Sequence, residues 1–596
     1  MVLFTHHRRD VVWAGRQLAD KGAKAVVPAA EAAAFTQVED FWRGFWTQRF
    51  HDYRQQSTKV LAEPMAVSRQ VRGGDTIAWE GLSIKVLDTP GYTAGAVSYL
   101  IELDGRRVAF TGDLIYGDGK ILDLYSFQDA IPALKIDGYH GFAARLADEI
   151  ASLGALAAAK PDVLIPARGT IIREPDKAIE TLIGRIQALY ANYLSTDAAR
   201  LWEGDANQAK KAQRVLGADA RIELRPKAPG PSTGPPWVVA NALGDGPMFQ
   251  ANVGRLPAWV VPLPSPSKLV LAADGTGFLI DCGFDPQLEA LRKLKADGKL
   301  KSLEHVFITH AHDDHTDKVA ECVEEFGPTV HAVGAMRDIL ENPRAYRTPC
   351  LTDNPIRVTG KHADGETWKW KEFELTMFPF PGQTLYHGAL LVKKAGGETV
   401  FFIGDSFTRS GMDDYCLQNR NLLGAGQGYF LCMDLLRQKA PDALLVNSHI
   451  DETFHFSGKQ LDQMRGALAR RVELLKELMP WDGVNYGLDE GWARFCPYGL
   501  ELRPGEKAAV SLRILNHSPR ERVFHVRLRP PAGSKIHALA ADSLTIPAGQ
   551  VRALEVPISA AEDAPAGFHV LTADASCDDW ELREWAEAMV YVKRGQ

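Results

Sequence analysis

The chain has 596 residues, of which 45% are hydrophobic and 24% charged, and its formal net charge is -7 at pH 7. This length exceeds what one ordinary core needs and predicts three or four domains. The acidic balance lacks the clustered Lys and Arg of a nucleic-acid binder, and no apolar run is long enough to span a membrane, so we expect a small-molecule substrate as partner rather than nucleic acid or a membrane.

The chain opens on a strand-like segment, residues 2–4, and a polar turn, THHRRD, at residues 5–10. No secretory signal is visible at Met1, and the seven cysteines are scattered without a CxxC pair. We therefore expect reduced thiols, no cysteine-based zinc site and a cytoplasmic location. A matching motif later in the chain has far more sequence before it. We therefore expect opening strands to be missing here, and a signal peptide lost with them would change the expected location.

Three segments follow in chain order. Residues 176–194 carry apolar side chains at helical spacing and predict a helix, in which the recurring positions are Ile179, Leu182, Ile183, Ile186 and Leu189. The Pro-rich stretch RPKAPGPSTGPPW predicts a linker at residues 224–237 that ends a first domain, residues 1–223. Residues 268–283 predict two strands joined by an Asp-Gly turn.

The pattern changes near Gly499, where apolar and polar residues begin to alternate. The apolar positions are Val510, Leu512, Ile514, Phe524, Val526, Leu528, Leu554, Val556 and Ile558. Period-2 segments divided by turn residues predict an antiparallel β-sandwich at residues 496–596, after a domain at residues 238–495. Its Trp580 and Trp585 are candidate contact residues, although burial in the core is the favoured interpretation.

Four short segments before the linker return in the same order after it. VLFTHHRRD, LDTPGYTAG, VAFTGDLI and VLIPARGT are matched by VFITHAHDDH, FPFPGQTLYH, VFFIGDSF and LLVNSHID. The matched positions keep a nearly constant separation and pair His6 with His310, Tyr92 with Gln383, Asp113 with Asp405 and Arg168 with His449. The sequence therefore predicts a duplicated unit.

The motif THAHDDH, residues 309–315, places three histidines and two aspartates directly after an apolar, strand-like run. Open sheets have their ligand sites at such strand ends, and imidazole with carboxylate suits Zn²⁺, Mn²⁺ or Fe. His310 and His312 can reach one ion, while Asp314 and His315 can turn toward a second. The alternative is a solvated polar turn, which the ordered set of downstream partners disfavours.

This combination resembles the metallo-β-lactamase fold superfamily of metallohydrolases, well over residues 238–480 and in degenerate form over residues 1–200. The resemblance implies an α/β (α+β) chain with two αββα sandwiches in tandem, followed by a C-terminal sandwich that looks immunoglobulin-like. In this family a dinuclear site is built from HxHxDH, a later His, a bridging Asp and a final His. It implies two Zn²⁺ ions here, with Fe or Mn as alternatives.

The resemblance can be carried over residue by residue. It gives His310 and His312 to the first ion, Asp314 and His315 to the second, Asp405 as the bridge and His449 as the last ligand of the second ion. Gln383 stands where the family usually has His, and we expect His387, four residues later, to supply that ligand. Otherwise the first site keeps two histidines and water.

In the first block, only His6, Asp10 and Asp113 remain ligand-type at the matching positions. Arg8 and Arg168 bring positive charge into the space that a dication would occupy. We expect these arginines to pair with Asp10 or Asp113 instead. The first block is therefore predicted to be a metal-free pseudo-domain.

The function that the resemblance implies is metal-dependent hydrolysis of an ester, thioester, lactone, lactam or phosphodiester. Asp314 is the predicted catalytic residue, which orients hydroxide and moves its proton. One alternative is an iron-dependent oxidoreductase of the sulfur dioxygenase type on the same fold; the diiron type is disfavoured because those members usually have Glu at the position of His312. The other is a non-enzymatic binding module, in which the C-terminal sandwich could support a homodimer.

The predicted substrate-binding residues are Tyr386, Arg420 and His455, with Arg409 and Asn419 as further candidates for the pocket lining. For His455, an ordinary structural role is favoured over a contact with substrate or ligands. His305, His331 and His362 are expected to be surface or hydrogen-bonded histidines.

Overall fold

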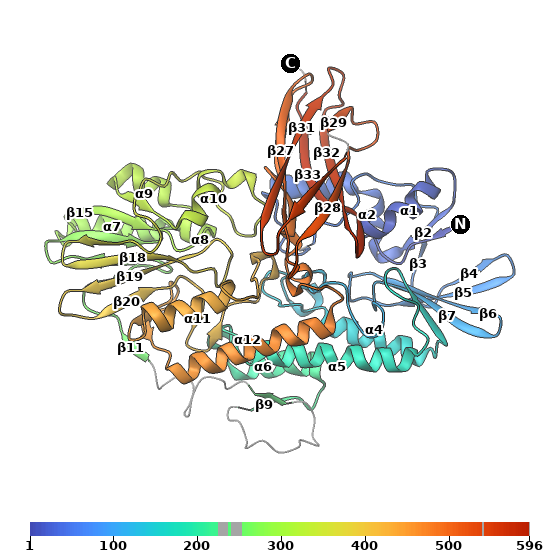
Figure 1. The fold of residues 1–596 in the computed structure, drawn as a ribbon, viewed down its shortest axis with the longest axis horizontal. Coiled ribbons are helices and arrows are strands. Elements are labelled where there is room, and N and C mark those ends of the chain that lie inside the picture. Colours follow the sequence, from blue (N-terminus) through green and yellow to red (C-terminus); the bar gives the residue numbers. More distant parts are fainter. Residues whose placement is uncertain (56, 224–236, 240–252, 539–540, 595–596) are drawn as a thin grey trace.

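The computed structural model describes residues 1–55, 57–223, 237–239, 253–538 and 541–594. Two mixed α/β blocks lie side by side, and a largely β C-terminal region stands between them (Figure 1). Apart from Trp237, the predicted linker at residues 224–237 lies outside the described residues. On either side of it, β9 (Arg221–Glu223) and β10 (Trp237–Val239) pair as parallel strands.

The first block contains two sheets with helices outside them. One sheet is parallel, with the order β1 (Val2–Leu3), β2 (Ala25–Pro28), β3 (Arg69–Val71). The other runs β4 (Thr76–Trp79), β5 (Leu82–Asp88), β6 (Val97–Leu103), β7 (Arg106–Gly112), β8 (Val163–Pro166). The helices are α1 (Arg9–Ala19), α2 (Ala32–Thr36), α3 (Val38–Thr47), α4 (Leu146–Ala158), α5 (Pro175–Leu194) and α6 (Arg200–Leu216).

The second block also has two sheets. A five-stranded sheet runs β12 (Val260–Pro262), β13 (Lys268–Leu271), β14 (Thr276–Ile280), β15 (Ser302–Phe307), β16 (Thr329–His331). A seven-stranded sheet runs β11 (Val253–Arg255), β24 (Glu452–Phe454), β23 (Leu444–Val446), β20 (Thr399–Phe402), β19 (Gly388–Lys394), β18 (Phe373–Pro379), β17 (Thr367–Trp370). A small hairpin is formed by β21 (Phe407–Thr408) and β22 (Gly411–Met412).

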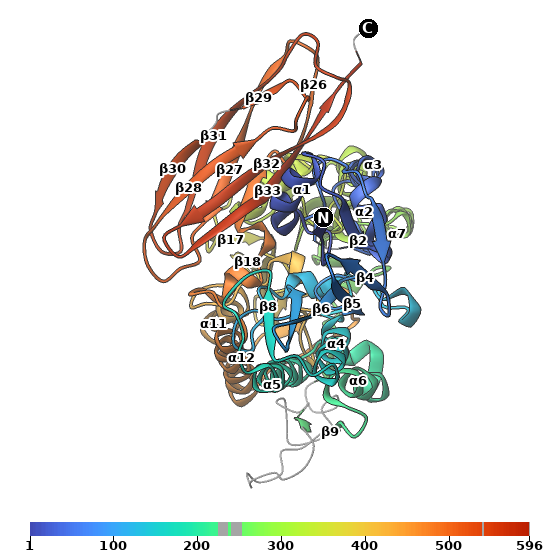
Figure 2. The same cartoon turned by 90° about the vertical axis from the view of Figure 1, so that its right-hand side faces the viewer.

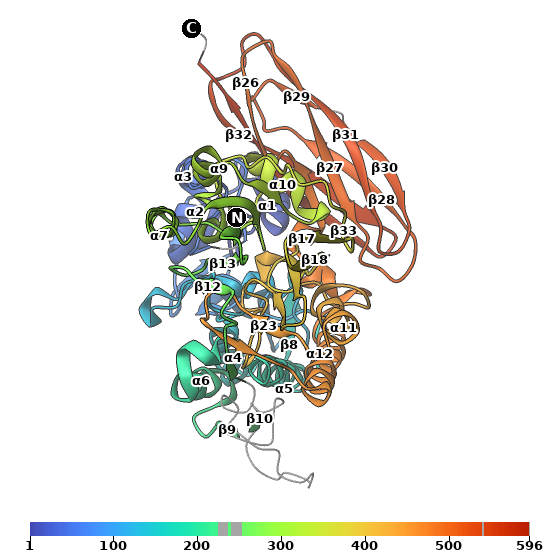
Figure 3. The same ribbon diagram turned by 90° about the vertical axis from the view of Figure 1, so that its left-hand side faces the viewer.

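Helices cover both outer faces of the second block. Figures 1 and 3 show α7 (Asp285–Ala296), α9 (Val319–Phe326) and α10 (Arg337–Glu341) beyond one sheet, and α11 (Gly428–Lys439) and α12 (Gly458–Leu478) beyond the other. The short helix α8 (Asp313–Thr316) follows β15. The predicted hairpin at residues 268–283 is confirmed, since β13 and β14 pair antiparallel through a turn in which Gly275 has φ +86°.

The two blocks share a strand order, as the repeated motifs predict. β5, β6, β7 and β8 follow the same sequence of two antiparallel pairs and one parallel pair as β18, β19, β20 and β23. The first sheets differ. β15 lies between β14 and β16, whereas β1 pairs with β2 alone among the described strands.

The two blocks also pack on each other through long helices. The predicted helix at residues 176–194 is confirmed as α5, which begins with Pro175 in its first turn. Its recurring apolar residues are buried, with Ile183 partly so. Figures 1 and 3 show α5 beside α12, and Asn192 Nδ2 donates a hydrogen bond to the Ala467 carbonyl oxygen at 2.9 Å.

The C-terminal region consists of two sheets, long and narrow in Figure 2. One runs β25 (Ala493–Cys496), β27 (Lys507–Leu515), β31 (Val551–Ala560), β29 (Ile536–Ala538), and the other runs β26 (Gly499–Leu502), β33 (Trp580–Val592), β32 (Gly567–Cys577), β28 (Arg522–Arg529), β30 (Ala541–Ile546). The period-2 segments are confirmed, because their apolar residues lie buried in β27, β28 and β31. The predicted boundary at residue 496 cuts β25.

One buried apolar cluster extends through all three parts. It contains Leu182 of the first block, Leu468 of the second and Trp585 of the C-terminal region. All seven cysteines are free thiols, as expected. Among the described residues, the helices are too short or too polar for any of them to cross a bilayer.

Candidate metal centre

The predicted metal-binding residues stand where strands of the second block end. β15 lies between two parallel neighbours, β14 and β16, and ends at Phe307, shortly before the motif and α8. β20 ends just before Asp405 and β23 just before His449. Because β20 and β23 are parallel neighbours, their carboxyl ends lie together. The two sheets thus bring distant segments of the sequence to one place.

Four of these residues form a compact group. Ligand atoms of Asp314, His315, Asp405 and His449 all lie within 4.8 Å of one another. Asp405 Oδ2 is 3.4 Å from His315 Nε2 and 3.1 Å from His449 Nε2. Asp314 Oδ2 is 3.4 Å and 3.2 Å from the same two nitrogens. Two carboxylates and two imidazoles at such distances can hold a divalent cation.

His310 and His312 lie next to this group, and the ring centres of His310 and His315 are 4.0 Å apart. His310 Nε2 is 3.9 Å from Asp405 Oδ2 and 3.0 Å from His312 Nδ1. His312 Nε2 lies 3.3 Å from Asn419 Oδ1. Asp405 is therefore in contact with both halves of the motif, which is the position that a bridging ligand needs.

Gln383 and His387 occupy different places beside this group. Gln383 Nε2 donates to Asp405 Oδ2 at 3.3 Å and to Asp413 Oδ2 at 3.2 Å. The His387 ring stacks on that of His310 with 4.8 Å between ring centres, and its Nε2 lies 3.3 Å from Ser406 Oγ. Gln383, rather than His387, thus touches the carboxylate at the centre. The ligand role of His387 stays a prediction.

The charges of the group suit a cation. Burial alone would lower the pKa of His449, but Asp405 and Asp314 raise it to about 10. Burial lowers the pKa of His310 well below its ordinary value, and His315 and His312 lower it further. Within the part of the chain that the structure describes, four buried atoms here have no hydrogen-bond partner: His315 Nε2, Gln383 Oε1, His387 Nδ1 and Asp405 Oδ1. Unpaired nitrogen and oxygen atoms of the kinds that bind metals, gathered around a shared carboxylate, fit a metal site.

Asp281 supports the group from behind, and the sequence prediction missed it. It is fully buried, and its Oδ2 lies 2.8 Å from His315 Nδ1. The same carboxylate accepts hydrogen bonds from Thr309 and Ser448. It therefore connects the strand ends that carry His315 and His449. The only signal in the sequence is an Asp at the end of an apolar strand, which is common.

The predicted substrate-binding residues divide into two groups. Tyr386 and Arg420 line a narrow cavity next to the metal-binding residues. Asn419 contacts His312, whereas Arg409 forms an ion pair with Glu452 at 2.7 Å. His455 Nδ1 lies 3.4 Å from the Ala443 carbonyl oxygen, which fits the structural alternative for this residue.

The first block forms part of the wall around the centre, which the sequence analysis did not predict. The ring centre of Tyr139 lies 6.3 Å from that of His312. Tyr53 Oη lies 3.2 Å from Cys350 Sγ, and the carbonyl oxygen of Cys350 accepts a hydrogen bond from the backbone N–H of Asp313 at 2.5 Å. Side chains of the first block thus reach the loop that carries the motif.

In the first block's own counterpart site, the predicted pairing of Arg168 is found. Arg168 Nη1 is 2.6 Å from Asp10 Oδ2, and Nη2 is 2.6 Å from Asp113 Oδ2. His6 Nε2 contacts the same Asp113 oxygen at 3.0 Å. Arg8 pairs instead with Asp129, at 3.5 Å. A guanidinium therefore lies between the two carboxylates.

The family model of the metallo-beta-lactamase superfamily matches residues 2–168 and 262–408, more than half of the chain. Hydroxyacylglutathione hydrolases of Brucella ovis and Brucella abortus are 29% identical over 119 residues, which is 20% of this chain and 34% of theirs. The chain thus spans about a third of the length of these curated relatives.

Solved structures with similarity include a Cronobacter sakazakii metallo-beta-lactamase with a HARLDQ motif, at 16% identity and a TM-score of 0.29, covering 38% of this chain and 95% of that one. Another is the B3 metallo-beta-lactamase BLEG-1, at 20% identity and a TM-score of 0.27, covering 35% of this chain and 98% of that one.

Proposed function

The chain belongs to the metallo-beta-lactamase superfamily, and we propose that its second block, residues 238–495, is a metal-dependent hydrolase. The observation that carries the proposal is the position of Asp405 Oδ2, within 3.9 Å of His310, His315 and His449. Residues 1–223 are proposed to be a metal-free unit of the same αββα fold, and residues 496–596 an immunoglobulin-like sandwich.

The residues present fit two divalent cations, with Zn²⁺ preferred and Fe or Mn as alternatives. His310 and His312 would hold one, with Gln383 or His387 as a further neighbour, and Asp314, His315 and His449 would hold the other, with Asp405 between them. When bound, such ions supply a nucleophilic water at neutral pH and stabilise negative charge that develops on the substrate.

The neighbouring side chains would position a ligand, accept a proton and limit the access of water. Asp281 fixes the ring of His315 through its 2.8 Å contact with Nδ1. Asp314 is partly exposed, and its Oδ2 is the proposed proton acceptor beside the attacking water. Tyr139 and Asn419 stand next to His312 and limit access of bulk water from that side.

Acyl transfer to water is the favoured reaction. The matched relatives are named hydroxyacylglutathione hydrolases, so thioesters are the first substrates to test, followed by esters, lactones, lactams and phosphodiesters. No serine or cysteine nucleophile is needed in this scheme, because the nucleophile is water.

The test compares the purified chain with Asp405→Asn and with Asp442→Asn, an exposed control. Metal content is measured by mass spectrometry and hydrolysis on the substrate panel. We expect bound metal in the parent and the control, and a loss of kcat/KM by about a hundredfold or more in Asp405→Asn. Oxygen consumption by an iron-loaded protein without hydrolysis would support the oxidoreductase instead. Equal activity of Asp405→Asn would refute the metal mechanism.

A further inference from the structure

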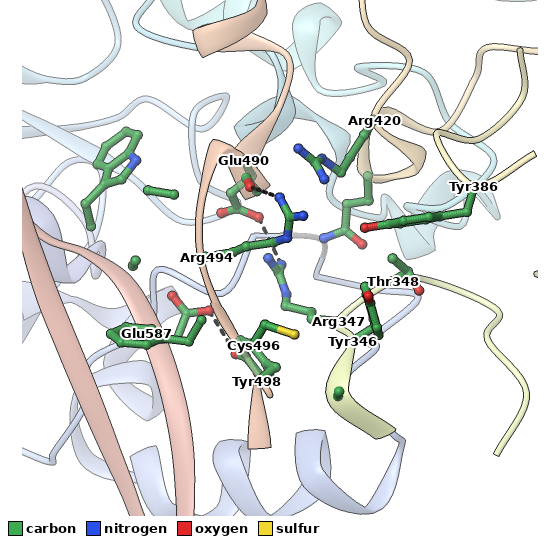
Figure 4. Close-up of a pocket in the computed structure, with 17 residues that line it drawn as sticks. Tyr346, Arg347, Thr348, Tyr386, Arg420, Glu490, Arg494, Cys496, Tyr498 and Glu587 are labelled. Carbon is green, nitrogen blue, oxygen red and sulfur yellow. Dashed lines mark hydrogen bonds and ion pairs between the residues drawn. The ribbon is translucent and has the colours of Figure 1, made fainter. Parts of the chain in front are cut away.

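A cavity beside the metal-binding residues is lined by the second block and the C-terminal region. Three of its side chains are arginines: Arg347 from the loop after α10, Arg420 from the loop before α11, and Arg494 from β25. Figure 4 shows their guanidinium groups and the Tyr386 hydroxyl turned toward one another. Trp585 and Glu587 of β33 also line the cavity.

The acidic groups of the cavity are already neutralised. Glu490 contacts Arg347 at 2.9 Å and Lys59 at 3.4 Å. Burial alone would raise the pKa of Glu490, but attraction to Arg347 and Lys59 lowers it to about 2. Glu587 is paired with Arg9 and also accepts a hydrogen bond from the Tyr498 hydroxyl. Both carboxylates are therefore already paired, and neither balances the charge of a further arginine in the cavity.

Arg494 is the arginine of the cavity that these carboxylates do not balance. Its guanidinium donates to the Gly491 carbonyl oxygen at 3.2 Å, and within the described part of the chain no carboxylate lies at ion-pair distance from it. Burial lowers the pKa of Arg494, and the nearby charge of Arg420 lowers it further. A guanidinium stays protonated in proteins. The cavity thus holds a positive charge with which no carboxylate of the described residues forms an ion pair.

Arg420 adds a free donor to the same space. Its Nε and Nη2 are held by Asp489 at 2.7 Å and 2.8 Å, while Nη1 is buried and has no hydrogen-bond partner among the described residues. Arg420 also has left-handed backbone angles, φ 62° and ψ 52°. For a residue with a Cβ this conformation is strained. Such local strain is found where a side chain must be aimed at a functional site.

The cavity is next to the proposed reaction centre. Gln418 and Arg420 line it, and Asn419 between them contacts His312 Nε2 at 3.3 Å. Tyr386 lines it too and directly precedes His387, which stacks on His310. A group held by the arginines would therefore lie on the His312 side of the metal-binding residues.

From these contacts we infer that the cavity lined by Arg420, Arg494 and Tyr386 binds an oxyanionic group, a carboxylate or a phosphate. A planar guanidinium fork and a hydroxyl match such a group. That this group belongs to the hydrolysed substrate rests on the proposed function.

The test uses the full metal-loaded chain and three variants. Arg494→Gln removes the unpaired charge, Arg494→Lys keeps the charge without the fork, and Arg552→Gln removes one exposed arginine of the same C-terminal region as a matched control. Calorimetry measures binding of inorganic phosphate and of succinate at matched metal content. We expect Arg494→Gln to weaken binding of one of these anions by about tenfold or more, with Arg494→Lys between and Arg552→Gln unchanged. Unfolding curves confirm that each variant is folded.

A second measurement separates this inference from the proposed hydrolysis. Thioesters that differ only in a terminal carboxylate, phosphate or amide are compared, and a preference for one charged substrate that Arg494→Gln abolishes supports an anionic substrate and identifies the group. If anion binding depends on Arg494 but no substrate is hydrolysed, the cavity is an anion site and the hydrolase proposal fails. Equal anion binding by the parent and Arg494→Gln overturns the inference, even where hydrolysis is found.

Discussion

Asp281 controls the orientation of a metal-binding residue without belonging to the motif. Its carboxylate contacts His315 Nδ1, Thr309 and Ser448 at once, from a left-handed backbone conformation with φ 58°. Asp tolerates this conformation better than most residues do. A charged acceptor on the far nitrogen fixes the tautomer of His315, so that Nε2 faces Asp314 and Asp405.

Replacing this carboxylate by an amide should therefore weaken metal binding. In Asp281→Asn the amide nitrogen can no longer accept from His315 Nδ1, and we expect metal affinity to fall by about 10- to 100-fold. Competition with a chelator measures the affinity. Asp274→Asn, at the exposed β13–β14 turn, serves as the control. An unchanged affinity in Asp281→Asn would show that the ring of His315 is held by packing alone.

The residues of the motif were predictable because their types and spacing carry the chemistry. His310, His312, Asp314 and His315 adjoin one another in the sequence, and Asp405 and His449 follow recognisable strands. Asp281 and Arg494 were not, because an Asp after a strand and an Arg within a strand are ordinary until the fold shows what they face. Only the tertiary arrangement shows that Gln383, and not His387, touches Asp405.

Glu149 provides a pH-dependent prediction away from the metal centre. It is fully buried on α4, and burial raises its pKa well above the ordinary value. The folded state therefore holds the neutral acid, whereas the unfolded chain ionises above pH ~4.5. The resulting contribution to stability is present below that pH and is lost as pH rises toward the folded pKa.

The side chain of Glu149→Gln cannot ionise, so this variant should not show the loss of stability that Glu149 causes as the pH rises. Between pH 5 and 8 we expect the unfolding free energy of the parent to fall relative to the variant by up to about 1.4 kcal/mol per pH unit, the value for one proton. Urea unfolding at several pH values measures the difference. A gap between the two proteins that stays constant with pH would mean that Glu149 is ionised in the folded state.

Among the elements, α1 and the ends of β7 and β8 are joined by one side chain. Arg168 follows β8 and reaches Asp10 on α1 and Asp113 after β7, with a further hydrogen bond to Tyr92. Attraction to Asp113 and Asp10 outweighs burial and raises the pKa of Arg168 further, so the cation is permanent. The same strand ends in the second block surround the proposed metal site.

Removing this cation should destabilise the first block. Arg168→Gln leaves two buried carboxylates without their main partner, and we expect the unfolding free energy to fall by about 3 kcal/mol. Arg168→Lys keeps the charge but not the bidentate geometry and should lie between. Arg173→Gln, which is exposed nearby, controls for the lost charge. Metal content should stay at the parent level in all three. Extra metal in Arg168→Gln would show that the first block retains a site.

The elements were predictable wherever a local pattern was strong. α5 and the β13–β14 hairpin follow from apolar spacing and turn residues, as do the alternating strands of the C-terminal region. The strand order shared by both blocks also follows from the repeated motifs. The contact of the first block with the metal centre through Tyr53 and Tyr139 did not follow, because it depends on how the two blocks pack, which no local pattern records.

On the scale of the whole molecule, Trp585 lies where the three parts meet. It belongs to β33 of the C-terminal region, and its ring centre is 6.0 Å from that of Trp492 in the second block. Lys59 Nζ of the first block lies 3.9 Å from its ring centre. The side chain is 2% exposed and part of the apolar cluster that all three parts share. Such a junction couples the stability of the parts.

Trp585→Ala should therefore weaken the whole chain rather than one part of it. The cavity left by a buried Trp costs about 3–5 kcal/mol, while Trp79→Ala, at an exposed hairpin, should cost less than about 1 kcal/mol. Circular dichroism follows all three parts, and release of bound metal reports on the second block alone. If the parts unfold together, both signals shift to lower denaturant by the same amount. If metal is released at the same denaturant concentration as in the parent while the circular dichroism signal shifts, the second block folds independently. Its stability would then not depend on this junction.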